Sequence, residues 1–176
     1  KLVEDARREV ATSLGLRGPV RPEQLIFTSC GSEADNLAIF GTAYAKERRR
    51  GGRIITTDSE HSGVEKAMQA LEADGFEVIR IPTRGGELDW NAYADALNAR
   101  TFFVSMMMVN NETGAVMPIA QMAKLTHKLA PDAILCPPPC PPTDSDASLI
   151  ATERSIPLSN CSHEPLALAL AFPSVP

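Results

Sequence analysis

No apolar run in this sequence approaches the roughly 20 residues that a helix needs to cross a bilayer, and no signal-peptide pattern opens it. Positive charge is also scarce: the formal net charge is −5, which argues against binding to nucleic acid or to an anionic membrane. The four cysteines match no zinc or disulfide spacing. We therefore expect a soluble, cytoplasmic protein with no metal site and no membrane or nucleic-acid partner.

The residues that are present fit one globular domain. With 176 residues, 44% of them hydrophobic and 22% charged, the chain can bury a sizeable core. A basic cluster at residues 46–50 suits the solvated end of a helix better than a nucleic-acid site. The first residue is Lys1 rather than methionine, so we expect that the N-terminus of a longer protein is missing.

Up to about residue 135, short apolar runs alternate with stretches of helical periodicity. The apolar runs predict strands at Gln24–Thr28, Arg53–Thr57, Glu77–Pro82, Thr101–Val109 and Ala133–Leu135. The periodic stretches predict helices at Leu2–Leu14, Glu33–Arg49, Gly63–Asp74, Asp89–Ala99 and Ile119–Leu129. Such alternation with short loops indicates an α/β fold of three layers, in which helices cover both faces of a mainly parallel sheet.

Residues 136–176 differ in composition from the rest of the chain. They hold nine of the fourteen prolines and neither glycine nor lysine, and proline removes backbone donors. We therefore divide the chain into a domain at residues 1–135 and a proline-rich tail at residues 136–176. We expect the tail to be disordered or to come from a shifted reading frame, the alternative being a natural truncated variant.

The most informative segment is Thr28–Asn36, which reads T-S-C-G-S-E-A-D-N. It joins a predicted strand to a predicted helix, and the free N–H groups and dipole at a helix start favour a phosphate there. Gly31 would let the backbone approach a ligand, and the Ser32 hydroxyl would donate to a phosphate oxygen. The alternative is that Ser32 only caps the helix, in a loose capping box with Asp35.

Two further polar segments follow predicted strands. D-S-E-H ends at His61, and N-N-E-T-G starts at Asn110 and includes Asn111. Because ligands of open parallel sheets bind beyond the carboxyl ends of the strands, we expect all three segments to meet at one crevice. His61 can stack on a flat ring or move a proton, and Asn111 can donate its amide to an oxygen, although a helix cap and a turn are the simpler roles.

Three sequence segments occur in the order and at the spacing of a known family: T-S-C-G-S-E-A-D-N, I-I-T-T-D-S-E-H and V-S-M-M-M-V-N-N-E-T-G-A-V-M-P-I. Residues 1–135 resemble the cysteine desulfurases of the NifS and IscS kind, within the class V aminotransferase superfamily. The resemblance implies part of the large domain of a fold type I enzyme whose cofactor is pyridoxal 5'-phosphate.

The resemblance also implies roles for residues at matching positions. Gly31 and Ser32 match the pair that binds the cofactor phosphate. His61 matches the histidine that stacks over the pyridine ring and takes part in proton transfer, so it is the expected catalytic residue. Asn111 matches an asparagine beside the ring that helps to hold the substrate carboxylate. Cys30 stands where the family usually has glycine, and it adds a side chain at a tight turn.

Two groups that the family uses have no counterpart in this sequence. After Leu135 the family continues with an aspartate that pairs with the pyridine nitrogen, whereas this chain has Cys136 and prolines. The family's Ser-His-Lys motif, whose lysine bonds to the cofactor, is matched only by Ser162-His163, and the last lysine is Lys128. Because that lysine also moves protons, we expect this polypeptide to be inactive by itself. An incompletely covered sheet also predicts marginal stability.

The resemblance implies the activity of the complete enzyme. That enzyme would convert L-cysteine to L-alanine and enzyme-bound sulfur, as a transferase of sulfur metabolism and iron–sulfur cluster assembly. The family further implies a small amino-acid substrate, a sulfur-acceptor protein and, at full length, a homodimer. The alternatives are a fragment of a selenocysteine lyase or another class V aminotransferase, and a non-catalytic module that binds a partner protein.

Overall fold

Helices and strands alternate along the chain in the computed structural model, which describes residues 1–13, 25–45, 52–136, 148–151 and 168–171. The helices are α1 (Leu2–Ser13), α2 (Gly31–Tyr44), α3 (Ser62–Ala73), α4 (Trp90–Ala96) and α5 (Ile119–Leu129). The strands are β1 (Leu25–Thr28), β2 (Arg53–Thr57), β3 (Glu77–Ile81), β4 (Thr83–Arg84), β5 (Glu87–Leu88), β6 (Thr101–Ser105), β7 (Ile134–Cys136), β8 (Ser148–Ala151) and β9 (Leu168–Ala171). None of the described helices is both long and apolar enough to span a membrane.

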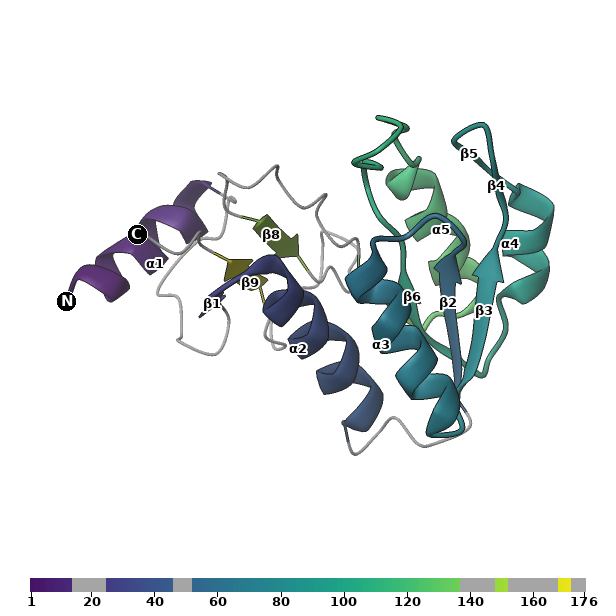
Figure 1. Cartoon of the computed structure of the whole chain (residues 1–176), viewed down its shortest axis with the longest axis horizontal. Coiled ribbons are helices and arrows are strands. Elements are labelled where there is room, and N and C mark those ends of the chain that lie inside the picture. Colours follow the sequence, from purple (N-terminus) through teal and green to yellow (C-terminus); the bar gives the residue numbers. More distant parts are fainter. Residues whose placement is uncertain (14–24, 46–51, 137–147, 152–167, 172–176) are drawn as a thin grey trace.

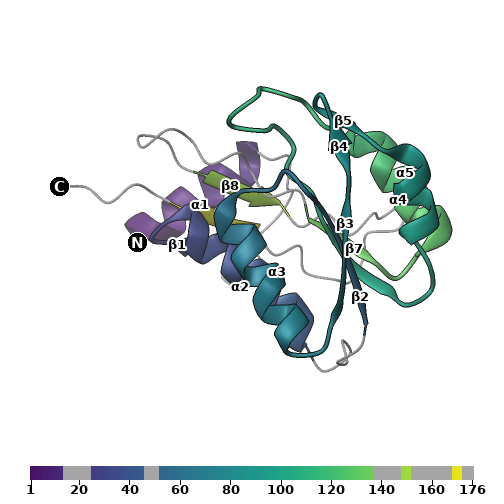
Figure 2. The same cartoon turned by 45° about the vertical axis from the view of Figure 1, so that its right-hand side comes forward.

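Four strands form a parallel sheet in the order β3-β2-β6-β7. Helix α3 covers one face of this sheet, and α4 and α5 cover the other (Figure 1). Helix α2 runs beside α3 on the same side (Figure 2). The predicted α/β class, a mainly parallel sheet with helices on both faces, is confirmed.

The centre of the sheet is buried on both faces. Because successive side chains of a strand point to opposite sides, Ile54 and Phe103 pack towards α2 and α3, whereas Ile55 and Val104 pack towards α4 and α5. All four side chains are fully buried. Strands that bury both faces read as continuous apolar runs, which is why such runs located β2 and β6 in the sequence.

A second, three-stranded sheet contains β1, β9 and β8 in that order. Strand β1 pairs with β9 in parallel, and β9 pairs with β8 in an antiparallel manner. The sequence had indicated no strand at β8 or β9. The disorder expected of the tail falls largely on residues 137–147, 152–167 and 172–176, which lie outside the described residues, and the division of the chain at residue 136 stays a prediction.

Several predicted boundaries differ from the structure, among them the end of α4, which lies at Ala96 rather than at Ala99. Strand β6 ends at Ser105 rather than at Val109, since the Met107 N–H donates to the Glu60 side chain (2.8 Å) instead of to a neighbouring strand. Gly85 and Gly86 form the tip of the β4–β5 hairpin, whose two short strands were not predicted from the sequence. Both have positive φ values, 60° and 87°, which glycine adopts without the penalty of a Cβ.

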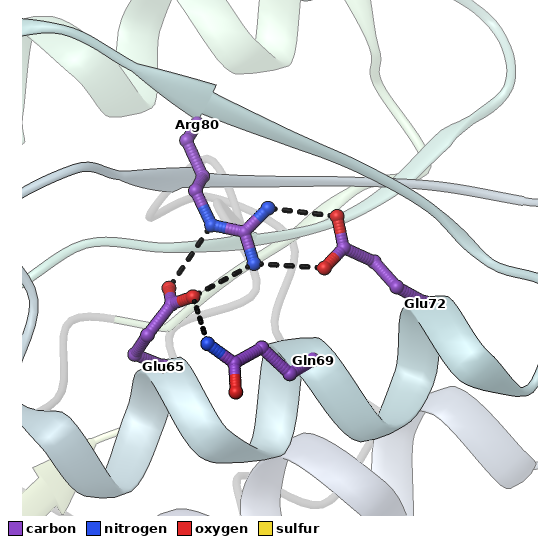
Figure 3. Close-up of polar contacts among 4 residues, drawn as sticks. All are labelled: Glu65, Gln69, Glu72 and Arg80. Carbon is purple, nitrogen blue, oxygen red and sulfur yellow. Dashed lines mark hydrogen bonds and ion pairs between the residues drawn. The ribbon is translucent and has the colours of Figure 1, made fainter.

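An ion-pair network holds α3 to β3, the edge strand of the parallel sheet (Figure 3). The Arg80 guanidinium donates to both carboxylate oxygens of Glu72 (2.7 and 2.9 Å) and to both of Glu65 (3.0 and 2.9 Å). Gln69 also donates to Glu65 (2.9 Å). The hydrogen bonds from Arg80 lower the pKa of both carboxylates, so their contribution to stability is lost as the pH falls through those pKa values.

We predict that Arg80→Gln lowers the free energy of unfolding by about 1 kcal/mol, because the network is partly exposed and therefore screened. Urea denaturation at low and high salt checks this, and the loss should shrink at 1 M NaCl. Arg8→Gln is the matched control, since Arg8 is exposed and its guanidinium bonds to Asp5 and to the Glu4 carbonyl within its own helix. A loss for Arg80→Gln that does not respond to salt, or no loss, would contradict the prediction.

Candidate functional site

The loop after β2 and the turn after β6 meet at the carboxyl edge of the parallel sheet. The side-chain amide of Asn110, which is buried, donates to the Ser59 carbonyl (3.0 Å). Its Oδ1 accepts from the backbone N–H groups of Glu112 (3.0 Å) and Thr113 (2.9 Å) and from the Thr113 hydroxyl (3.0 Å). One buried amide therefore shapes the turn and joins it to the loop.

The structure places Asn111 beside Asn110 in the same turn, exposed at the surface. The turn role expected of the two asparagines thus falls on Asn110. Sequence reasoning missed the link from Asn110 to Ser59, because two adjacent asparagines give no signal for which of them is buried. The proposed contact of Asn111 with a substrate stays a prediction.

His61 and Ser32 lie close together at the starts of α3 and α2. His61 Nδ1 accepts from the Gly63 N–H (3.1 Å), so His61 caps α3. A Cβ at Gly63 would lie 3.2 Å from His61 Nδ1 and 3.8 Å from Ser32 Oγ, which places the imidazole and the hydroxyl around the same point. Both residues and Lys66 line an open cavity of about 380 Å³ between the two helices.

The cap determines which nitrogen of His61 carries a proton. Since Nδ1 accepts a hydrogen bond, the neutral imidazole carries its proton on Nε2. Nε2 is therefore the ring atom that can donate to, or exchange a proton with, a bound molecule. The helix-cap alternative for His61 is confirmed, and it fixes the ring in one orientation.

The start of α2 differs from the predicted capping box. Cys30 is the N-cap residue, and the Ser29 N–H and hydroxyl donate to the Glu33 carboxylate (2.7 and 2.6 Å). The prediction that Ser32 caps the helix together with Asp35 is wrong. Ser32 instead lies in the first turn, exposed, with its hydroxyl near Gly63.

Cys30 and Gly31 form the turn that leads into α2. Cys30 has φ −160° and ψ 166°, an extended conformation that any residue adopts, so its side chain is accommodated without strain. Gly31 is the first residue of the helix. The first N–H groups of a helix have no intrahelical acceptor and carry the positive end of its dipole, so this turn suits an anion.

Two half-buried acids, Asp35 and Glu60, lie next to this site. Glu60 Oε1 accepts from the Thr57 hydroxyl (2.6 Å) and from the Met107 N–H (2.8 Å). Glu60 Oε2 and Asp35 Oδ1 are buried and have no hydrogen-bond partner among the described residues. Burial raises the pKa of each acid to about 7. Burial, with the nearby carboxyls, also raises the pKa of the Cys136 thiol to about 12, so this thiol stays protonated.

We predict that these carboxyls make stability fall as the pH rises. The folded chain keeps protons on Asp35 and Glu60 up to about pH 7, whereas the unfolded chain releases them near pH 4, so unfolding is favoured progressively between these values. The urea midpoint should be lower at pH 8 than at pH 5. Asp35→Asn combined with Glu60→Gln should flatten this dependence, and Glu9→Gln on exposed α1 should not. An unchanged slope in the double variant would contradict the assignment.

Comparisons with known proteins agree with this architecture. The sequence profile of the family described as aminotransferase class-V matches residues 1–136. A putative cysteine desulfurase IscS 1 of Bacillus subtilis is 39% identical over 126 residues, which cover 71% of this chain and 32% of that protein. A cysteine desulfurase of Enterobacter agglomerans is 40% identical over 128 residues, 72% of this chain and 30% of that protein. The chain spans about a third of the length of these relatives.

Solved structures show the same likeness. A NifS-like protein matches with a TM-score of 0.68 at 30% identity, over 78% of this chain and 39% of the other. DndA from Streptomyces lividans matches with a TM-score of 0.64 at 34% identity, over 76% of this chain and 36% of the other. The resemblance inferred from the three motifs is confirmed by the profile, the relatives and the fold. The chain belongs to the class-V aminotransferase family.

Proposed function

We propose that residues 1–135 are part of the cofactor-binding domain of a cysteine desulfurase, which takes sulfur from L-cysteine and leaves L-alanine. We also propose that the tail at residues 136–176 does not continue this domain beyond Cys136, the last residue of β7. The observation that carries the proposal is the meeting of the Ser32 hydroxyl and the His61 imidazole around Gly63, in a chain whose relatives are named cysteine desulfurases. The end of the family match at residue 136 supports the boundary.

The site fits pyridoxal 5'-phosphate in its phosphate and ring contacts. Gly31 and Ser32, in the first turn of α2, would bind the phosphate through backbone N–H groups and the exposed hydroxyl. His61, fixed by its bond to Gly63, would stack on the ring and hold a proton at Nε2. Asn111 would approach from the turn that Asn110 ties to the same loop. When bound, the cofactor would supply an electron sink for cleavage of bonds in the substrate.

Two groups that the family implies are missing from this fit: an acid for the pyridine nitrogen and a lysine for attachment of the cofactor. The family implies an aspartate after β7, whereas β7 ends here at Cys136, whose thiol is neutral and cannot pair with a protonated pyridine. No lysine follows Lys128 in the sequence. We therefore propose that this polypeptide holds the cofactor by non-covalent contacts.

The wider setting is also proposed from the family. A full-length protein of this kind would act on a small amino acid in the cytoplasm, pass sulfur to an acceptor protein for iron–sulfur cluster assembly, and form a homodimer. The substrate class is supported by the similar solved structure of SspA in complex with cysteine, which has 30% identity and a TM-score of 0.64.

We predict that the chain binds pyridoxal phosphate more tightly than pyridoxal, and that Ser32→Ala reduces this difference. One lost hydrogen bond to a charged phosphate should weaken binding of the phosphate ester by about tenfold. Equilibrium dialysis with both ligands measures the difference. Ser13→Ala is the matched control, since its hydroxyl donates within α1 to Val10. Equal affinities for the two ligands, or a wild-type affinity in Ser32→Ala, would contradict the phosphate site.

We also predict that the 176-residue polypeptide forms no alanine from L-cysteine above a protein-free control that contains free pyridoxal phosphate. Loss of general acid–base catalysis alone costs about 10²–10⁴-fold in rate, and the lysine that the family uses for attachment is also missing. Amino-acid analysis of the reaction mixture detects the product. Alanine above the control would show that another residue replaces the lysine.

A further inference from the structure

Glu60, the residue directly before His61, has no role in the proposed chemistry, yet its side chain bonds both to the end of β2 and to the segment after β6. Its Oε1 accepts from the hydroxyl of Thr57, the last residue of β2 (2.6 Å). The same oxygen accepts from the Met107 N–H (2.8 Å), which lies 47 residues further along the chain. One carboxyl oxygen thus joins the end of β2 to the segment that follows β6.

A second hydrogen bond joins the loop after β2 to the segment after β6. The Ser59 carbonyl accepts from the Asn110 side chain (3.0 Å), across 51 residues of sequence. Both residues before His61 are therefore hydrogen-bonded to the segment after β6. The His61 ring is itself held by the hydrogen bond from the Gly63 N–H. The imidazole is therefore restrained relative to the segment after β6.

The turn after β6 is also supported from its far side. Gly86, at the tip of the β4–β5 hairpin, packs so closely on Ala115 that a Cβ at position 86 would lie 2.6 Å from the Ala115 Cβ. The Asn110 N–H donates to the Ala115 carbonyl (2.8 Å) and closes the turn. The turn that carries Asn111 is therefore held by contacts that do not involve Glu60. The hydrogen bonds of Glu60 can then fix the position of the His61 loop relative to this turn.

We propose that Glu60 is a positioning residue, which sets the place of His61 relative to the turn that carries Asn111 by bridging Thr57 and the Met107 backbone. Glu60 acts through His61 and does not itself contact a bound molecule. The consequence for pyridoxal phosphate binding rests on the proposed function, whereas the consequence for the His61 ring does not.

Glutamine is the conservative replacement at this position. Burial raises the pKa of Glu60 to about 7, so at pH 6 the acid is largely protonated and accepts through its carboxyl oxygen. A glutamine amide offers an acceptor oxygen in the same place and with a similar shape. Alanine removes the acceptor and leaves the N–H of Met107, a buried residue, without its partner.

The test compares Glu60→Ala and Glu60→Gln in the full 176-residue chain at pH 6. One readout is the NMR signal of the His61 ring, with exposed His127 on α5 as an internal reference. The other is the dissociation constant for pyridoxal phosphate by equilibrium dialysis. The matched control is Glu72→Ala, which removes an acid of α3 whose carboxylate accepts hydrogen bonds from Arg80 of β3.

We expect Glu60→Ala to move the His61 signal, to leave the His127 signal in place and to weaken cofactor binding by about tenfold. Glu60→Gln should keep the wild-type signal and affinity, and Glu72→Ala should lower stability without either change. A wild-type His61 signal and affinity in Glu60→Ala would overturn the proposal. So would the same two changes in Glu72→Ala, because they would then follow stability alone.

Two features keep the test decisive. If Glu60→Ala does not fold, Glu60→Asp decides: its shorter side chain cannot reach both Thr57 and the Met107 N–H, so the His61 signal should move, and a wild-type His61 signal in Glu60→Asp would overturn the proposal. If the wild-type chain does not bind pyridoxal phosphate, the proposed function fails, while the His61 signal still decides the role of Glu60.

Discussion

Parallel pairing of β2 with β6 is the constraint on which the rest of this structure depends. It brings the carboxyl ends of both strands to one edge, where the loop that carries His61 and the turn that carries Asn111 begin. Burial of both faces fixes the pairing, because a slip of one residue would move Ile54 to the side that Ile55 occupies. The hydrogen bonds of Glu60 and Asn110 then join the loop after β2 to the segment after β6 and fix their relative position.

This geometry lowers the free energy of unfolding at neutral pH. Asp35 and Glu60 each have one buried carboxyl oxygen without a partner among the described residues, and the charge of Asp35 adds to the raised pKa of Glu60. A purely structural core would place apolar groups there. Titratable groups with raised pKa values gather at functional sites, and this pair lies between the start of α2 and the loop of His61. The raised pKa values of Asp35 and Glu60 therefore point to the same edge of the sheet as Ser32 and His61 do.

Much of this fold could be predicted from the sequence, for physical reasons. Buried parallel strands read as apolar runs, and helices against a sheet show apolar periodicity, so β2, β3 and α5 were located to within a residue. The end of β6 was wrong because the apolar residues continue past it, while the Met107 N–H bonds to Glu60 and Val109 pairs with Val116 instead of with a strand of the sheet. The cap of α2 and the buried side of the Asn110 turn were missed because each depends on a choice between neighbouring polar residues.

The roles assigned to Ser32, His61 and Asn111 came from the order and spacing of three motifs, since their residue types alone are common in caps and turns. The most direct measurement is a crystal structure of the chain with pyridoxal phosphate. Our account predicts the phosphate at the first turn of α2, within hydrogen-bond distance of Ser32 Oγ, and the ring against His61. A cofactor bound elsewhere, with the first turn of α2 empty, would contradict it.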